Sequence, residues 1–346
     1  MLPVAVDVMG TDTGVAEVVK GARQAAEKDG IPVILVGRAD VLAGIDTGGL
    51  EIVPASEVVE MSDDPIDGVR RKRDSSVVKS AELVRDGAAS AMVSAGNTGA
   101  AVASATLRLG RIKGVQRPGI ATVLPVPGRR YPNVLLDSGG NAECRPAWVA
   151  QFGQMGAVYA AARFDLDQPR VGLISIGEEK SKGTTLVREA HELLARPGFV
   201  EAAGGRFIGN IEGRDALTDS VDVLVTDGFT GNVVLKTLEG ATKVLVSTFA
   251  GVLNSSDEAR QASEVLIPAL LPLYKELDVD TYGGAMLLGV DGVCIIGHGK
   301  SSARAIVNAV RLAATMVTSD LVGQLRSVVG RAPVDVAPDV PADLPS

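Results

Sequence analysis

The sequence predicts an α/β protein, with a mostly parallel sheet covered by helices on both faces. Short apolar runs alternate with longer helical patterns along most of the 346 residues, which is typical of a three-layer α/β/α sandwich. Aromatic residues make up only 3% of the chain, so Val, Leu, Ile and Ala must build the core. Many of the 40 glycines follow the apolar runs, where they would close turns between strands and helices.

Each predicted strand is a short run rich in Val, Ile, Leu or Ala that ends in a polar or glycine turn. These runs span residues 4–8, 33–36, 91–94, 120–124, 134–137, 171–176, 207–211, 223–225 and 293–296. The predicted helices are longer segments whose apolar residues recur at helical spacing. They span residues 14–28, 75–86, 97–109, 146–163, 185–195, 232–253 and 302–312.

No linker divides the chain, so we expect a single α/β/α domain over residues 1–330. Within this domain, residues 245–282 are expected to form a helical hairpin or arm. Residues 331–346 are proline-rich and acidic, a composition that predicts a disordered tail.

Charge and cysteine content restrict the class of protein. The net charge of −8 argues against general nucleic-acid binding. Cys144 and Cys294 are the only cysteines, and we expect them to be free thiols in a reducing cytoplasm. The N-terminus lacks the features of a signal peptide, and no apolar run approaches the ~20 residues of a membrane span. These features together predict a cytoplasmic protein.

Polar, glycine-containing loops follow six of the predicted strands, at residues 94–100, 137–146, 175–185, 209–215, 226–232 and 297–302. Ligands bind at the carboxyl ends of strands in open α/β sheets, so these loops are expected to meet at one edge and form a site. The residues predicted to contact phosphate or substrate are Asn97, Thr98, Gly99, Asn141, Gly177, Gly183, Thr184, Asp227, Thr230, Gly231 and His298.

The segment 222–240, DVLVTDGFTGNVVLKTLEG, combines a strand, a glycine turn and a helix. Such a junction leaves unpaired N–H groups at the helix start, and these groups and the helix dipole favour an anion. The sequence therefore predicts a phosphate or oxyanion site there, with Asn232 adding its side-chain amide.

The chain lacks the signals of several common catalytic sites. It has no GxSxG elbow, P-loop or GxGxxG fingerprint, and its acidic loops lack a metal-specific spacing, so neither a metal nor a cofactor is predicted. Lys182, beside Gly183, is a better candidate than Lys180 for balancing charge on a phosphate or oxyanion. His298 lies between two glycines, where ligand contact and packing are equally expected, whereas His191 is expected to be a packing or surface histidine of its helix.

Ordered segments from the first strand to about residue 310 resemble the bacterial phosphate acyltransferases of phospholipid synthesis. Those enzymes make acyl phosphate from acyl-[acyl carrier protein] and inorganic phosphate. The chain differs at Thr11, Gly140 and Thr184, where the family usually has glycine, alanine and asparagine. The matching segments are AVDVMGTD (5–12), VRRKRDSS (69–76), SAGNTGA (94–100), LLDSGGNAECRP (135–146), QFGQMGAVYA (151–160), IGEEKSKGTT (176–185), FIGNIEGRD (207–215), TDGFTGNVVLKTLEG (226–240) and YGGAMLLGVDGVCIIGHGKSSARAI (282–306).

The resemblance implies a fold similar to those of phosphate acetyltransferases and isocitrate dehydrogenases, a homodimer, and frequent peripheral association with the inner face of the membrane. It also implies that Lys182 and Asn232 are the catalytic residues and that the product feeds glycerophospholipid synthesis. Phosphate near pH 7 is largely dianionic and needs little general-base help, so we expect it to attack the thioester directly.

An acidic protein needs a local positive patch to bind an acidic carrier protein. The run Arg70, Arg71, Lys72 and Arg73 is the first candidate and Arg108 with Arg111 the second, although most runs of charge are simply solvated faces. The apolar run 265–273 is too short to span a bilayer. It would instead contact the core, a second subunit or a membrane surface.

Three other functions are compatible with the sequence. They are a phosphate acetyltransferase acting on a short acyl-coenzyme A, a nicotinamide-dependent hydroxyacid dehydrogenase of related fold, and a non-catalytic scaffold that binds carrier protein.

Overall fold

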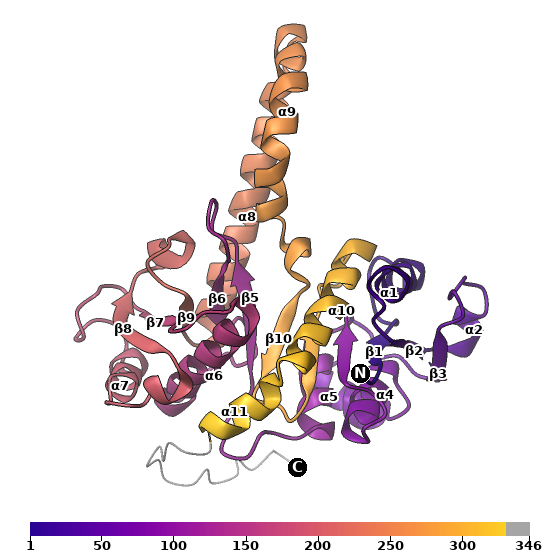
Figure 1. Cartoon of the computed structure of the whole chain (residues 1–346), viewed down its shortest axis with the longest axis horizontal. Coiled ribbons are helices and arrows are strands. Elements are labelled where there is room, and N and C mark those ends of the chain that lie inside the picture. The colour runs from indigo at the N-terminus through magenta and orange to yellow at the C-terminus, as the bar shows by residue number, and fades with distance from the viewer. Residues whose placement is uncertain (330–346) are drawn as a thin grey trace.

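The computed structural model describes residues 1–329, and the predicted tail at 331–346 lies outside them (Figure 1). Its strands are β1 Val4–Asp7, β2 Val33–Gly37, β3 Glu51–Pro54, β4 Ala91–Ser94, β5 Gly119–Leu124, β6 Asn133–Leu136, β7 Arg170–Ile174, β8 Arg206–Ile211, β9 Val223–Val225, β10 Ala285–Leu288 and β11 Val293–Ile296. They form one 11-stranded sheet in the order β3-β2-β1-β4-β11-β10-β5-β6-β9-β7-β8.

The helices are α1 Val15–Asp29, α2 Ala39–Leu42, α3 Pro65–Arg71, α4 Ser76–Arg85, α5 Thr98–Arg108, α6 Pro146–Phe164, α7 Thr185–Leu194, α8 Gly228–Leu253, α9 Asp257–Leu277, α10 Ala303–Thr318 and α11 Leu321–Val329. Short 3₁₀ turns occupy Glu201–Ala203, Gly213–Leu217 and Val279–Tyr282.

The sheet is mostly parallel, as predicted, because seven of its ten strand pairs are parallel. The three antiparallel pairs follow one another in the middle of the sheet. They are β11 with β10, β10 with β5, and β5 with β6. Three successive reversals leave the two halves pointing in opposite directions. Strands β1 to β4 and β11 run one way, and β6 to β9 run the other.

This reversal corrects the prediction that all six polar loops share one edge. The loops after β4 and β11 lie at one edge of the sheet, which we call the first edge. The loops after β6, β7, β8 and β9 lie at the opposite edge, which we call the second edge. Strands of four to six residues at ~3.3 Å per residue separate the two edges by roughly 13–20 Å.

Helices cover both faces of the sheet and bury an aliphatic core. Helices α1, α10, α11, α6 and α7 pack against one face, α4 and α5 cover the other face of the first half, and the first turns of α8 cover the second half. Helix α6 is buried from Ala147 to Ala160 and supplies Tyr159 and Phe152, the two largest fully buried side chains.

Helices α8 and α9 form an antiparallel arm that projects from the body of the molecule (Figure 1). Helix α8 begins at Gly228, but its first turns pack on the sheet, so the projecting part starts further along the helix; none of the residues of α9 is buried. Helix α9 continues through Pro268 and Pro272, because water can hydrate the carbonyl groups that these prolines leave unbonded. The apolar run 265–273 therefore does not belong to the core of the described chain.

Over residues 1–329, no single helix is long and apolar enough to cross a membrane. Helices α10 and α11 together have the required length and composition, but with a bend of 55° between them.

Candidate functional site

The second edge is organised around the buried carboxylate of Asp137, which directly follows β6. Its Oδ1 accepts hydrogen bonds from the backbone N–H groups of Ile120 (2.9 Å), Gly139 (3.2 Å) and Gly140 (2.8 Å). Its Oδ2 accepts from the backbone (2.7 Å) and side-chain (2.8 Å) nitrogens of Asn141. Burial raises the pKa of Asp137 and these donors oppose the rise. Because five N–H groups hold its two oxygens, this carboxylate shapes the loop of residues 138–141, which we call the glycine loop.

The start of α8 packs closely against this loop, and at Gly231 the approach leaves no room for a side chain. A Cβ on Gly231 would overlap the carbonyl oxygen of Asp137, and a Cβ on Gly139 would lie 3.6 Å from Cβ of Asn232. The Asn232 amide is therefore held beside the glycine loop, on an exposed position of the helix.

The predicted anion site at the helix start is largely occupied by the protein itself. The side chain of Asp227 caps α8, accepting from the backbone N–H (2.9 Å) and hydroxyl (2.8 Å) of Thr230, and the N–H of Gly228 donates to Asn141 O at 2.8 Å. The prediction of free N–H groups is wrong for these two residues. An aspartate three residues before the N–H it accepts from is an N-cap signal already present in the sequence.

The loop after β7 presents Lys182 to solvent. A Cβ on Gly177 would lie 3.0 Å from Cγ of Lys182, so the aliphatic stem of the lysine packs over this glycine. Gly183 has φ +95°, a left-handed conformation that favours glycine. The hydroxyl of Thr184 caps α7 by accepting from Val187 N (3.3 Å), a role typical of threonine at the residue before a helix.

A hydrogen-bond chain from β8 and α7 supports the lysine loop. Nδ1 of His191 lies 2.9 Å from Oδ1 of Asn210, whose Nδ2 donates to the carbonyl of Glu179 at 3.0 Å. The same carbonyl accepts the N–H of Lys182 at 2.9 Å. Because the amide oxygen of Asn210 can only accept, it accepts a hydrogen bond from the N–H at Nδ1 of His191. His191 also packs edge-on against Phe207, as a packing histidine would, but sequence reasoning missed Asn210.

Lys182 and Asn232 share a property within the described part of the chain. Both side chains are exposed, and neither has a hydrogen bond or an ion pair with the protein. They follow β7 and β9, which are neighbouring strands, and the glycine loop follows β6 on the other side of β9. The second edge therefore offers an ammonium group and an amide to one side of the glycine loop.

The first edge holds four of the predicted site residues, Asn97, Thr98, Gly99 and His298, apart from Lys182 and Asn232. Asn97 caps α5 by accepting from Ala100 N (3.0 Å) and donates to Glu60 O (3.2 Å). A Cβ on Gly99 would lie 2.5 Å from Pro65. Nδ1 of the exposed His298 accepts from Lys300 N (3.1 Å).

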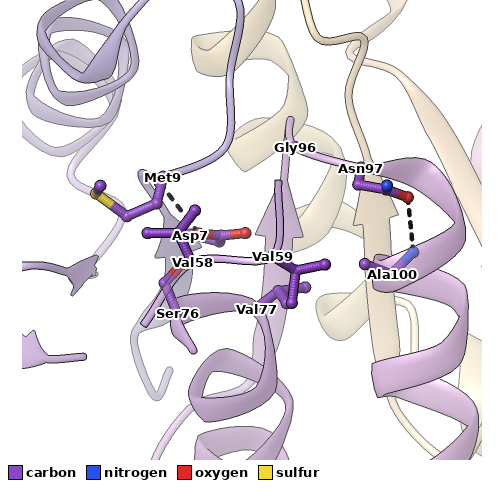
Figure 2. Close-up of a pocket in the computed structure, with 9 residues that line it drawn as sticks. All are labelled: Asp7, Met9, Val58, Val59, Ser76, Val77, Gly96, Asn97 and Ala100. Carbon is purple, nitrogen blue, oxygen red and sulfur yellow. Dashed lines mark hydrogen bonds between the residues drawn. The ribbon is translucent and has the colours of Figure 1, made fainter. Parts of the chain in front are cut away.

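A small polar cavity lies at the first edge (Figure 2). Its volume of about 10 Å³ is enough for a single water molecule. Asp7 lines it, accepting from Met9 N (3.1 Å) and Ser94 Oγ (2.7 Å), and burial raises the pKa of this carboxyl. The cavity is too small for an acyl donor.

The run Arg70 to Arg73 also lies beside the first edge, because Lys72 Nζ donates to Val58 O (2.8 Å) and Val58 lines the same cavity. Lys72 is paired with Asp63 at 2.6 Å and Arg71 with Asp67 at 3.6 Å. Arg70 and Arg73 are exposed. In the second predicted pair, Arg108 contacts Glu82 at 3.6 Å.

Cys144 lies next to the glycine loop of the second edge but has the properties of an unreactive thiol. Its Sγ donates to Asn141 O (3.6 Å), and burial raises its pKa to about 12. A thiol with this pKa is not a thiolate near neutral pH. Cys144 is therefore not suited to act as a nucleophile at the second edge. Over residues 1–329, no group of three His, Cys, Asp or Glu side chains could hold a metal ion.

Comparison with protein families gives one match, to the family described as "Fatty acid synthesis protein", over residues 2–324. Similar curated proteins are named phosphate acyltransferase. The one from Pelotomaculum thermopropionicum is 46% identical, and the alignment covers 95% of each chain. The one from Desulforudis audaxviator is 42% identical, over 94% of this chain and 96% of its own.

Comparison with solved structures agrees on the fold. The EutD phosphotransacetylase of Staphylococcus aureus superposes with a TM-score of 0.60 at 16% identity, covering 91% of this chain and 94% of its own. A phosphotransacetylase of Streptococcus pyogenes gives 0.61 at 17% identity, covering 93% and 94%. A 4-hydroxythreonine-4-phosphate dehydrogenase of Klebsiella pneumoniae gives 0.51 at 14% identity, covering 92% and 100%. At these identities the likeness concerns the fold alone.

Proposed function

The chain belongs to the bacterial phosphate acyltransferases, enzymes that transfer acyl groups to phosphate, and from this premise we propose its substrates and mechanism. The donor is a long-chain acyl thioester of acyl carrier protein, the acceptor is inorganic phosphate, and the acyl phosphate feeds glycerophospholipid synthesis in the cytoplasm. The observation that carries the proposal is the second edge. There, the exposed and unpaired Lys182 and Asn232 follow neighbouring strands, beside a glycine loop whose backbone is held by Asp137.

In the proposed reaction a phosphate oxygen attacks the thioester carbonyl carbon and forms a tetrahedral intermediate. The carbon–sulfur bond then breaks, the sulfur leaves as a thiolate, and the carrier thiol recovers a proton from solvent. The Lys182 ammonium balances charge on phosphate and on the intermediate, and the Asn232 amide donates a hydrogen bond to one of them. The high pKa of Cys144 supports direct attack over a route through an acyl-enzyme.

In this mechanism, three of the predicted site glycines allow close packing around the catalytic residues: Gly177, Gly183 and Gly231. Four other predicted residues hold the loops that carry or adjoin Lys182 and Asn232: Asn141, Thr184, Asp227 and Thr230. Neither a metal ion nor an organic cofactor takes part in the proposed reaction.

An assay of acyl-phosphate formation tests the proposal. The purified protein is incubated with phosphate and either palmitoyl-[acyl carrier protein], palmitoyl-coenzyme A or acetyl-coenzyme A, and acyl phosphate is trapped as the hydroxamate. The highest kcat/KM is expected with the carrier-protein substrate. A preference for acetyl-coenzyme A would instead support a phosphate acetyltransferase, the alternative suggested by the phosphotransacetylases among the fold neighbours.

We also propose that the arm formed by α8 and α9 pairs with a second copy of the chain. Large apolar side chains are exposed along it, and exposed apolar patches commonly mark an interface. They include Val244, Leu245, Phe249, Leu266, Leu270 and Leu271. The double variant Leu270→Asp, Leu271→Asp should convert a dimer to a monomer in light scattering. A variant that stays dimeric but no longer sediments with anionic lipid vesicles would assign these side chains to a membrane surface instead.

A further inference from the structure

We propose that the loop joining α5 to β5 is the docking surface for the acidic carrier protein. We call this loop, residues 109–118, the basic loop because it carries three cations, Arg111, Lys113 and Arg117. The inference rests on the proposed function, because it takes the acyl donor to be a carrier protein. It assigns docking to a different surface from the run Arg70 to Arg73, and it keeps Arg111 of the second candidate pair but not Arg108, which contacts Glu82.

The basic loop carries cations that the rest of the protein does not neutralise. All three side chains are exposed, and within the described chain none of them forms an ion pair. Many other cations in this acidic protein are paired, for example Arg311 with Asp29 (2.8 Å). An exposed cation without a carboxylate partner keeps its full long-range attraction for an acidic partner.

The basic loop is also held in a fixed shape. Ile112 and Val115 are buried, and the buried side chain of Gln151 accepts from Gln116 N (2.9 Å) and donates to Gly114 O (2.8 Å). A loop that is already ordered loses little conformational entropy when a partner binds.

Two cations are fixed by contacts of their own. The guanidinium of Arg111 donates to the carbonyl of Gln116, and that of Arg117 stacks 4.9 Å from the ring centroid of Trp148. These contacts hold the two charges in place without neutralising them.

The basic loop borders the second edge. Nδ2 of Asn141 donates to the carbonyl of Pro118, directly after Arg117, at 2.8 Å. Asn141 is part of the glycine loop that packs against Asn232 through Gly139. A carrier protein docked on the basic loop would therefore deliver its thioester to the edge that holds Lys182 and Asn232.

Arg70 and Arg73 provide a matched comparison, because they are exposed cations beside the first edge. If net charge alone governed docking, reversing either pair would have the same effect. If position governs it, only the pair bordering the second edge matters.

The test compares two double variants, Lys113→Glu with Arg117→Glu and Arg70→Glu with Arg73→Glu. Affinity for unacylated holo-carrier protein is measured by fluorescence anisotropy at two salt concentrations, and KM is measured with the acylated carrier. In the variant of Lys113 and Arg117, Kd and KM for the carrier should be roughly tenfold higher at low salt, and Kd should depend less on salt concentration. The variant of Arg70 and Arg73 should behave like wild type. The kcat/KM for a carrier-free acyl thioester should be unchanged in both.

Arg117 packs on Trp148, so the single variant Lys113→Glu repeats the test without disturbing that contact. An unchanged carrier Kd in both basic-loop variants, or an equal loss in the Arg70 variant, would overturn the docking assignment. A wild-type protein that binds no carrier and turns over only coenzyme A thioesters would overturn the proposed substrate instead.

Discussion

At the first edge of the sheet the strand-end loops bind one another, whereas at the second edge the polar side chains of Lys182 and Asn232 have no partner in the described chain. Thr11 Oγ1 and Asp12 N both donate to Gly299 O, at 3.0 and 2.8 Å, and Asn97 ties its own loop to Glu60. At the second edge, Lys182 and Asn232 bond to nothing in the described chain. A buried aspartate lies at each edge. Under the proposed function, similar loop sequences serve packing at the first edge and reaction chemistry at the second.

The largest expected effect comes from removing the exposed ammonium at the second edge. Lys182→Ala should lower kcat by ~10²–10³, because one charge-stabilising donor typically contributes that much. Lys180→Ala is the matched control, since Lys180 is an exposed lysine of the same loop. Steady-state kinetics of both variants measures this effect, and circular dichroism spectra equal to that of the wild type show that both variants are folded. Equal rates in the two variants would remove Lys182 from the mechanism.

A smaller effect is expected from the glycines of α8. Gly231→Ala would push a Cβ into the Asp137 carbonyl and should lower the free energy of unfolding by about 1–3 kcal/mol. Gly240→Ala, which has no neighbour within 4 Å, should instead raise it by up to about 1 kcal/mol. Urea denaturation measures both. Two variants of equal stability would show that the start of α8 is not tightly packed on the glycine loop.

The smallest effect in this series concerns the support of the lysine loop. Losing the hydrogen bond from Asn210 to Glu179 O should cost about 1 kcal/mol, so Asn210→Leu and Asn210→Asp should lower kcat roughly fivefold. His191→Asn, which keeps a donor near Nδ1, should stay close to wild type.

A double-mutant cycle separates positioning from general stability. In the Lys182→Ala background, Asn210→Leu should have no further effect on kcat, because its influence passes through Lys182. An undiminished effect in that background would give Asn210 a role that does not involve the lysine.

Most elements of the fold followed from the sequence because apolar runs and helical spacing are local signals. The strands β3 and β10 were missed. Strand β3 is largely exposed, and the β10 sequence AMLL contains neither alternation nor a β-branched residue. Missing β10 hid the reversal in the middle of the sheet, and with it the separation of the two edges.

The candidate site was predictable in its residue types but not in its grouping. The neighbourhood of Asn232 followed from a strand, a glycine turn and a helix within one segment. The pairing of Asn210 with His191 and Glu179 could not be found in the same way, since it joins residues 19 and 31 positions apart through the packing of separate elements. The same holds for the carboxylate of Asp137, whose donors include Ile120, 17 positions away.

The central claim, that chemistry takes place at the second edge alone, is tested most directly by comparing kcat for Asn232→Ala and His298→Ala at saturating phosphate and acyl donor. Both side chains are exposed polar groups of strand-end loops or helix starts, one at each edge. The account predicts a loss of ~10²–10³ for Asn232→Ala and a rate close to wild type for His298→Ala. A large loss in His298→Ala, or none in Asn232→Ala, would contradict it.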